Sequence, residues 1–266
     1  MKNSLNHKSA CGVGFIASLK DKKSHHVLKR GLLALERLEH RGGLGDGAGI
    51  LTEIPWDILG EKRGEVAVAT IFAPNEERRF NLALEIFEQT FWVRGLEVSG
   101  HRDVPIDKSV LPKKAAENCP RIIQAFIKRP DHCRTLSSFD KLLYLAKQNN
   151  CKNLRKHGMR GEFFFASLSS SNIVYKGLCS SELLSKFYLD LQNKDYKTSF
   201  CLFHRRFCTN TLSSWDKAQP FRMIAHNGEI NTIEGNKSWM VKREKALGLG
   251  EGELITHTGT SDSGNL

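Results

Sequence analysis

The sequence predicts an α+β fold in which helices cover the outside of a mixed β-sheet. Segments typical of strands and of helices alternate along the chain, but they follow no strict strand–helix–strand order. The chain has 266 residues, and 40% of them are hydrophobic. This is enough apolar material for a substantial core in one large domain or two small ones. The sequence contains no internal repeat and no low-complexity tract.

Apolar runs and glycines define the first elements. Residues 12–19 (GVGFIASL) predict a short buried strand, and residues 50–54 predict a second one. Between them, residues 27–38 place leucines and Val27 on one side of a helix. Residues 40–49 (HRGGLGDGAG) contain five glycines and predict a tight irregular loop, because glycine adopts positive φ at little cost.

The remaining elements follow from the same patterns. Strands are expected where β-branched and aromatic residues gather, at 66–72, 96–102, 122–128, 199–207 and 223–227. Helices are expected where apolar residues recur at helical spacing, at 76–90, 139–148, 182–191 and 231–247. Residues 163–169 and 172–177 flank a serine-rich turn and predict a β-hairpin.

The charge distribution argues against a nucleic-acid-binding surface. The net charge is +11, but Lys and Arg are spread along the chain among acidic residues. The densest cluster, residues 152–160, holds only four basic side chains. A basic composition is only the first sign of such a surface, and the sequence offers no second one.

The sequence also predicts no membrane segment and no metal site. No run of eighteen apolar residues is present, as a transmembrane helix would need. Residues 1–10 are polar and lack the apolar core of a secretory signal, so we expect a cytoplasmic protein. Seven cysteines occur at irregular spacing without a CxxC pair, which favours buried thiols over a zinc site or a disulfide framework.

Cys11 is the first candidate for chemistry. A thiolate is a strong nucleophile, but an ordinary thiol needs a base to activate it. Removal of residues 1–10 would give Cys11 a free α-amino group, which can act as that base. The small neighbour Gly12 would let a substrate approach. Taken alone, Cys11 is more typical of an inert structural thiol.

Three further groups have both a functional and a structural interpretation. Arg206 ends an apolar run and could bind a carboxylate in bidentate fashion beside Thr209, or lie in a solvated turn. The Asn227–Gly228 pair could stabilise an oxyanion, or form a type I′ turn. Asp262 could bind an ammonium group, or cap a turn. The order and combination of these groups are more specific than any one of them.

The stretches that carry these residues resemble the class II glutamine amidotransferase domain of glutamate synthase large subunits. They read ACGVGFIASL, LERLEHRGGLGDGAGIL, RFCTNTLSSW, AHNGEINTIEGNKSWM and GTSDSGNL, and the resemblance covers nearly the whole chain. It implies an N-terminal nucleophile hydrolase fold, which is a four-layer αββα sandwich. It also implies a propeptide at residues 1–10 and the amidotransferase domain at residues 11–266.

The resemblance assigns a role to each candidate residue. Cys11 matches the nucleophile, while Asn227 and Gly228 match the oxyanion hole. The residues that match the glutamine-binding pocket are Arg206 for the carboxylate, Thr209 in the same loop, Asp262 for the α-amino group, and Arg41 near the pocket.

The implied reaction is hydrolysis of L-glutamine through a γ-glutamyl thioester on Cys11. The resemblance implies that the ammonia then serves the amination of 2-oxoglutarate in the full-length enzyme. That enzyme uses FMN and an iron–sulfur cluster, whereas no cofactor is expected in this chain. The resemblance implies two partners, which are a separately encoded synthase domain and a small subunit.

Three departures from the family pattern bear on this expectation. The loop between His40 and Gly49 is shorter than usual, with a segment missing between Leu44 and Gly45, and Cys208 replaces a serine. The family's domain continues beyond the position of residue 266, so we expect a sandwich that is incomplete at its C-terminal edge. An inactive truncated remnant is therefore the main alternative. A cysteine hydrolase for another amide is a weaker one, because Arg206 and Asp262 together fit a free α-amino acid.

Overall fold

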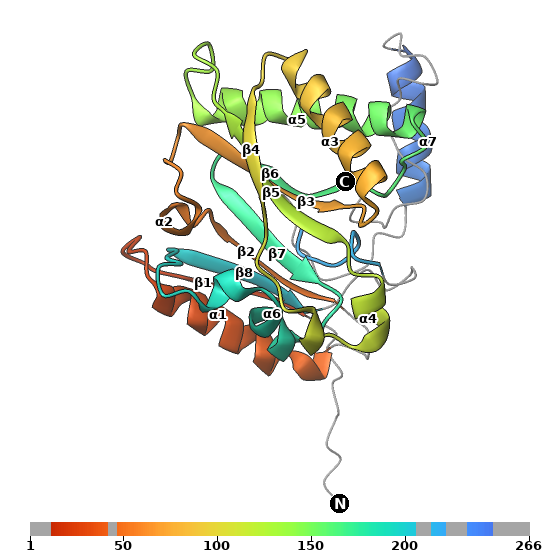
Figure 1. Cartoon of the computed structure of the whole chain (residues 1–266). Coiled ribbons are helices and arrows are strands. Elements are labelled where there is room, and N and C mark those ends of the chain that lie inside the picture. Colours follow the sequence, from red (N-terminus) through yellow and green to blue (C-terminus); the bar gives the residue numbers. More distant parts are fainter. Residues whose placement is uncertain (1–11, 42–46, 206–213, 222–232, 247–266) are drawn as a thin grey trace, which may run out of the picture.

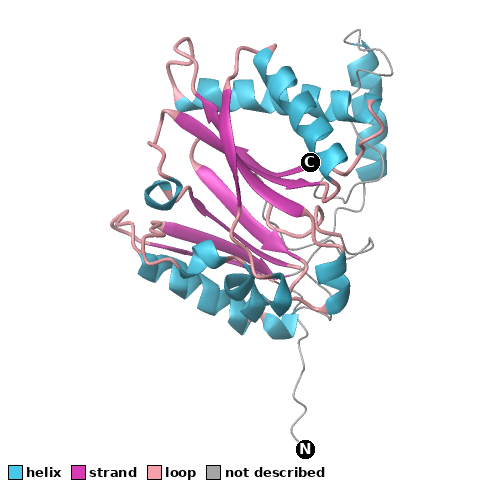
Figure 2. Ribbon diagram, in the orientation of Figure 1, coloured by secondary structure: helices cyan, strands magenta, loops and turns pink. Residues whose placement is uncertain are grey.

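The protein is a sandwich of two four-stranded β-sheets with helices on both outer faces (Figure 1, Figure 2). The computed structural model describes residues 12–41, 47–205, 214–221 and 233–246, and the statements below concern these residues. Helices α1 and α6 cover one sheet, and helices α3 and α5 cover the other (Figure 1). The four layers confirm the αββα architecture expected from the resemblance.

The first sheet joins strands from both halves of the chain. Its order is β1-β8-β2-β7, and the strands span Val13–Ala17, Phe200–Arg205, Ala48–Glu53 and Asn172–Gly177, respectively. Every pairing in it is antiparallel, and β1 lies at the edge. Consequently, β1 begins where β8 and β7 end.

The second sheet comes from one continuous part of the chain. Its order is β4-β5-β3-β6, with strands at Val98–Asp103, Arg121–Lys128, Val66–Ala73 and Phe164–Ser169. All of β3 is buried, because Val68 and Phe72 pack toward the first sheet while Ala69 and Ile71 pack toward the helices. A strand covered on both faces is a continuous hydrophobic run rather than an alternating one.

Helices α1 at His25–Arg37, α3 at Glu77–Trp92 and α5 at Leu136–Lys156 pack on the layers of the sandwich, whereas helix α7 at Ile233–Ala246 is mostly exposed. Ser24 caps α1, because its side chain accepts a hydrogen bond from the Val27 N–H. Gly31 allows α1 to approach β8, since a β-carbon there would lie 2.4 Å from the sulfur of Cys201. The shorter helices are α2 at Trp56–Leu59, α4 at Lys113–Glu117 and α6 at Ser181–Phe187, with 3₁₀ turns at Glu39–Arg41, Lys108–Val110 and Leu189–Gln192.

Two sequence-based expectations about strand pairing are wrong. The predicted hairpin does not form, because β6 and β7 belong to different sheets and the serine-rich turn carries the chain from one sheet to the other. The same turn residues suit a hairpin and a corner between stacked sheets, so local sequence cannot distinguish them. The sheets are also not mixed, since every pairing between the described strands is antiparallel. The strand predicted at 223–227 lies outside the described residues.

The sandwich has two ends, which we name after one residue at each. At the Gly12 end, β1 begins, β8 and β7 end, and Trp215 packs edge-on against Phe72 of the second sheet at 5.9 Å between ring centroids. At the Glu53 end, β2 ends and the Ile54 N–H donates to the Ser171 carbonyl in the crossover turn.

Candidate active site

The Gly12 end begins with a very close contact between two strands. The Arg205 N–H donates to the Gly12 carbonyl at 2.5 Å. A β-carbon at residue 12 would lie 2.0 Å from the Arg205 carbonyl oxygen, so only glycine fits there. Gly12 follows Cys11 in the sequence, and Arg205 precedes Arg206. The residue that follows Cys11 is therefore in direct contact with the residue that precedes Arg206.

Arg205 fixes the glycine-rich loop at both of its ends. Its side chain is 2% exposed, and its Nε and Nη2 donate to the two carboxylate oxygens of Glu39 at 2.9 and 2.6 Å. Its Nη1 donates to the Gly47 carbonyl at 3.2 Å. A bidentate, charge-assisted pair is among the stronger hydrogen-bonding arrangements in proteins. The Arg205 guanidinium thus joins the residues that precede and follow positions 42–46.

The Glu39 carboxyl group is held in its charged form. Burial raises the pKa of Glu39, but hydrogen bonds from Arg205 and Ser181 outweigh burial, so the net pKa lies below the ordinary value. The Ser181 N–H, at the start of α6, donates to this carboxylate at 2.9 Å. The acidic group therefore links α6, β8 and the 3₁₀ turn that contains Arg41.

Residues 214–221, which we call the docked segment, lie directly on the ends of β2 and β7. Three glycines allow this approach. A β-carbon would lie 2.8 Å from the Ala218 side chain at Gly47, 2.4 Å from the Gln219 carbonyl at Gly49, and 2.9 Å from the Trp215 ring at Gly177. Such distances exclude any side chain without movement of the segment.

Lys176 lies under the docked segment. It is fully buried, and its Nζ donates to the carbonyls of Asp216 and Ala218 at 2.8 and 2.6 Å. The same atom lies 4.9 Å from the ring centroid of Phe164 and 4.4 Å from that of Phe221. Burial lowers the pKa of the Lys176 ammonium group to about 7, although the charge of Asp216 acts in the opposite direction.

Arg41 is the predicted site residue that the structure describes. It is half-buried in the 3₁₀ turn, two residues after Glu39. The other predicted site residues lie outside the described part of the chain: Cys11, Arg206, Thr209, Asn227, Gly228 and Asp262.

Sequence reasoning missed Glu39, Arg205 and Lys176. Lys176 had a detectable signal, because a single charge interrupts the otherwise apolar run NIVYKG. Arg205 had none, since it precedes another arginine and nothing local shows which of the two points into the core.

Burial makes Cys119, Cys151, Cys179 and Cys201 poorly suited to act as nucleophiles. Burial raises the pKa of Cys119 to about 11 and the pKa values of Cys179 and Cys201 to about 12. Burial also raises the pKa of Cys151. A thiol with a raised pKa is a poor nucleophile at neutral pH. None of these four thiols therefore competes with Cys11 for the nucleophilic role.

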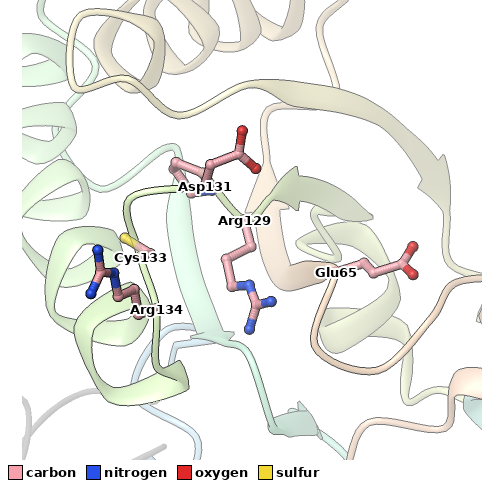
Figure 3. Close-up of a pocket in the computed structure, with 6 residues that line it drawn as sticks. Glu65, Arg129, Asp131, Cys133 and Arg134 are labelled. Atoms are coloured by element: carbon pink, nitrogen blue, oxygen red, sulfur yellow. The ribbon is translucent and has the colours of Figure 1, made fainter.

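A polar cavity of about 270 Å³ lies at the other end of the sandwich, among Glu65, Arg129, Pro130, Asp131, Cys133 and Arg134. It sits between the end of β5 and the start of β3, at the Glu53 end. Figure 3 shows that its charged side chains point in different directions and do not converge on a common point. This arrangement does not suit the recognition of a small molecule.

Two searches of the described residues gave negative results. No group of three His, Cys, Asp or Glu side chains there is suited to hold a metal ion. None of the helices in these same stretches has the length and apolar character to cross a bilayer.

The αββα sandwich with a glycine-lined end is the architecture of an N-terminal nucleophile hydrolase. Residues 11–263 match the family of class II glutamine amidotransferases, and the chain belongs to this family. The resemblance noted in the sequence is thereby confirmed.

Known relatives narrow the class further. The chain is 40% identical over 261 residues to a chloroplastic ferredoxin-dependent glutamate synthase of Oryza sativa subsp. japonica, which covers 91% of this chain and 16% of the relative. It is 38% identical over 286 residues to ferredoxin-dependent glutamate synthase 2 of Synechocystis sp., covering 98% and 18%, respectively. The ferredoxin-dependent glutamate synthase of Cyanidium caldarium is 39% identical over 283 residues, covering 97% and 18%. The chain therefore spans about a sixth of the length of these relatives.

Proposed function

We propose that this chain is the glutaminase part of a glutamate synthase and that it hydrolyses L-glutamine to glutamate and ammonia. The observation that carries this proposal is the contact between Gly12 and Arg205. In a chain of this family, that contact supports a nucleophile at Cys11 beside a glutamine-binding loop that starts at Arg206. The bidentate Glu39–Arg205 pair, in which the arginine is buried, anchors this junction.

The proposed reaction starts after removal of residues 1–10, which leaves the domain 11–266. The new α-amino group of Cys11 accepts the thiol proton, and the thiolate attacks the Cδ carbonyl of glutamine. Asn227 and the Gly228 N–H stabilise the oxyanion of the tetrahedral intermediate. Collapse of this intermediate, with a proton returned from the Cys11 α-ammonium group, expels ammonia and leaves a γ-glutamyl thioester, which water hydrolyses to glutamate with release of the Cys11 thiol.

Four further residues bind the substrate in this proposal. Arg206 binds the α-carboxylate in bidentate fashion, and Thr209 supports it from the same loop. Asp262 binds the α-ammonium group. Arg41 contributes positive charge next to the pocket, from a turn that Glu39 and Arg205 hold against the sheet.

The ammonia is proposed to serve the amination of 2-oxoglutarate in a larger enzyme. The relatives are named ferredoxin-dependent glutamate synthases and are about six times longer than this chain. We therefore propose a synthase domain as partner, with ferredoxin as the electron donor.

The test is to express the chain, determine its N-terminal mass, and measure glutamate release from L-glutamine. We expect loss of residues 1–10, release of glutamate, and no release in Cys11→Ala. Arg206→Ala is expected to raise KM by roughly 30-fold, because a charge-assisted hydrogen bond contributes about 2 kcal/mol.

Two results would contradict the proposal. Hydrolysis by Cys11→Ala would remove Cys11 from the mechanism. An intact N-terminus combined with no hydrolysis would instead favour the inactive remnant.

A further inference from the structure

The buried Lys176 is costly for a residue that serves only the fold. A cation moved from water into a protein interior is destabilising unless other groups compensate it. No ion pair of Lys176 with a carboxylate is present among the described residues. Two neutral carbonyls and two aromatic rings surround it instead. An apolar side chain of similar length would fill this space without the cost of desolvation.

The ammonium group adds polar attachment to a segment that also packs through the buried Trp215 ring on Phe72 and Phe187. The side chains of Ser214, Trp215 and Gln219 each have a buried polar atom without a hydrogen-bond partner. Two hydrogen bonds from β7 to this segment are described, and both come from Lys176. Lys176 therefore provides the described hydrogen bonds from β7 to this segment, whereas the glycines at 47, 49 and 177 provide the space for its close approach.

The docked segment connects two parts of the proposed glutamine site. The stretch before it contains Arg206 and Thr209, and the stretch after it contains Asn227 and Gly228. Because residues 214–221 lie between these two groups in the sequence, we expect a shift of this segment to disturb binding that requires both groups. Misplacement by about 1 Å is enough to cost two orders of magnitude in rate.

We propose that Lys176 is a positioning residue for the glutamine site, because its ammonium group holds residues 214–221 on β7 and this segment lies in the sequence between the proposed carboxylate-binding residues and the proposed oxyanion hole. This inference rests on the proposed function. It assigns Lys176 no contact with the substrate.

The test compares two reagents that react with Cys11 in the full chain. The glutamine analogue 6-diazo-5-oxo-L-norleucine must bind both the carboxylate loop and the oxyanion hole before it alkylates the thiol. Iodoacetamide requires neither. For Lys176→Met, we expect at least a tenfold fall in kinact/KI for the glutamine analogue. We expect the iodoacetamide rate to stay within twofold of wild type, and intact mass spectrometry measures both.

Ile173→Ala is the matched control. Ile173 is a fully buried residue of the same strand, and strand alternation places its side chain on the face opposite to Lys176, so we expect this variant to lower Tm while the Lys176 hydrogen bonds remain. Both variants are assayed well below their melting temperatures. Ile173→Ala is expected to react with both reagents at rates close to those of wild type.

The outcomes separate this inference from the function on which it rests. If the glutamine analogue fails to label the wild type, the proposed function fails. If it labels the wild type and Lys176→Met equally, the positioning role is overturned. The positioning role would also be overturned if Lys176→Met reacted more slowly with both reagents by the same factor and Ile173→Ala showed the same loss.

Lys176→Gln, which retains a hydrogen-bond donor, is the second variant in case Lys176→Met does not fold. A smaller fall in kinact/KI for the glutamine analogue, with an unchanged iodoacetamide rate, would support the proposal. If neither variant folds, Lys176 serves the fold alone and the inference is wrong.

Discussion

The two ends of the sandwich bury different kinds of groups. At the Gly12 end, two cationic side chains, Arg205 and Lys176, are almost completely buried, and glycines bring backbone segments into direct contact. At the Glu53 end, charged side chains surround an open cavity, and ion pairs such as Lys128–Glu97 are about half-exposed. Buried charge and close backbone contact are costly, whereas exposed charge is nearly neutral for stability. These costly features of the Gly12 end lie where we propose the chemistry.

The largest expected difference between the ends concerns two tryptophans. Trp215 is buried against Phe72 and Phe187, whereas Trp92 is 71% exposed near the Glu53 end. Trp215→Ala is expected to lower the free energy of unfolding by about 4 kcal/mol, as for other large buried aromatics. Trp92→Ala should lower it by less than about 1 kcal/mol. Urea unfolding measures the free energy of both variants. Similar losses in the two variants would contradict the proposed difference between the ends.

A smaller effect is expected for glycine. In Gly49→Ala, the new β-carbon would meet the Gln219 carbonyl, so we expect a loss of about 2 kcal/mol. Gly235→Ala in helix α7 is the matched change, because nothing lies within 4 Å of its added carbon. It should raise stability by about 0.5 kcal/mol, since alanine favours a helix more than glycine does. Thermal unfolding of both variants would show whether the close approach at the Gly12 end is as tight as the distances indicate.

The stability that Glu39 contributes at the Gly12 end depends on pH. Its pKa is lower in the folded than in the unfolded protein, so its stabilising effect is present above the ordinary glutamate pKa. That effect is lost as pH falls through the lowered pKa. Glu39→Gln is expected to cost about 1 kcal/mol at pH 7, because the carboxylate is partly exposed, and to flatten stability between pH 5 and 3. Glu97→Gln, at the Glu53 end, should change the stability at pH 7 and its dependence on pH by less than Glu39→Gln does. A larger effect of Glu97→Gln would contradict the proposed difference between the two ends.

The smallest effect is expected in the cavity at the Glu53 end. Arg134 is exposed and lines that cavity without converging on its neighbours (Figure 3). Arg134→Ala should change unfolding free energy by no more than about 0.5 kcal/mol and leave glutamine hydrolysis unchanged. A marked loss of hydrolysis would show that this cavity takes part in the reaction.

The sequence predicted best those elements whose burial follows a regular pattern, either throughout a strand or along one face of a helix. β3 was expected at residues 66–72 and spans Val66–Ala73. Helix α3 was expected at 76–90 and spans Glu77–Trp92. By contrast, α5 was expected at 139–148 but extends from Leu136 to Lys156. Its second half buries Asn150 and donates from Asn153 to Thr90 of α3, so polar residues occupy the packed face and hide the helical pattern.

The order of the motifs predicted the family, but it could not predict the residues that hold the candidate site in place. The partners of Arg205 are Glu39 and Gly47, which lie far away in the sequence. Lys176 is bound by backbone carbonyls, which carry no sequence signal. Such contacts depend on tertiary structure, whereas the predicted strand and loop motifs depend on local composition.

The origin of the two sheets has a consequence for the order of folding. The second sheet comes from residues 66–169 without interruption, whereas the first combines strands that precede and follow this stretch. During synthesis, the second sheet is complete before β7 and β8 emerge from the ribosome. Strand β1 must wait for β8, because Val13 pairs with His204. The Gly12 end is therefore the last part to assemble, and a chain that stops before β8 has no strand against which β1 can pair.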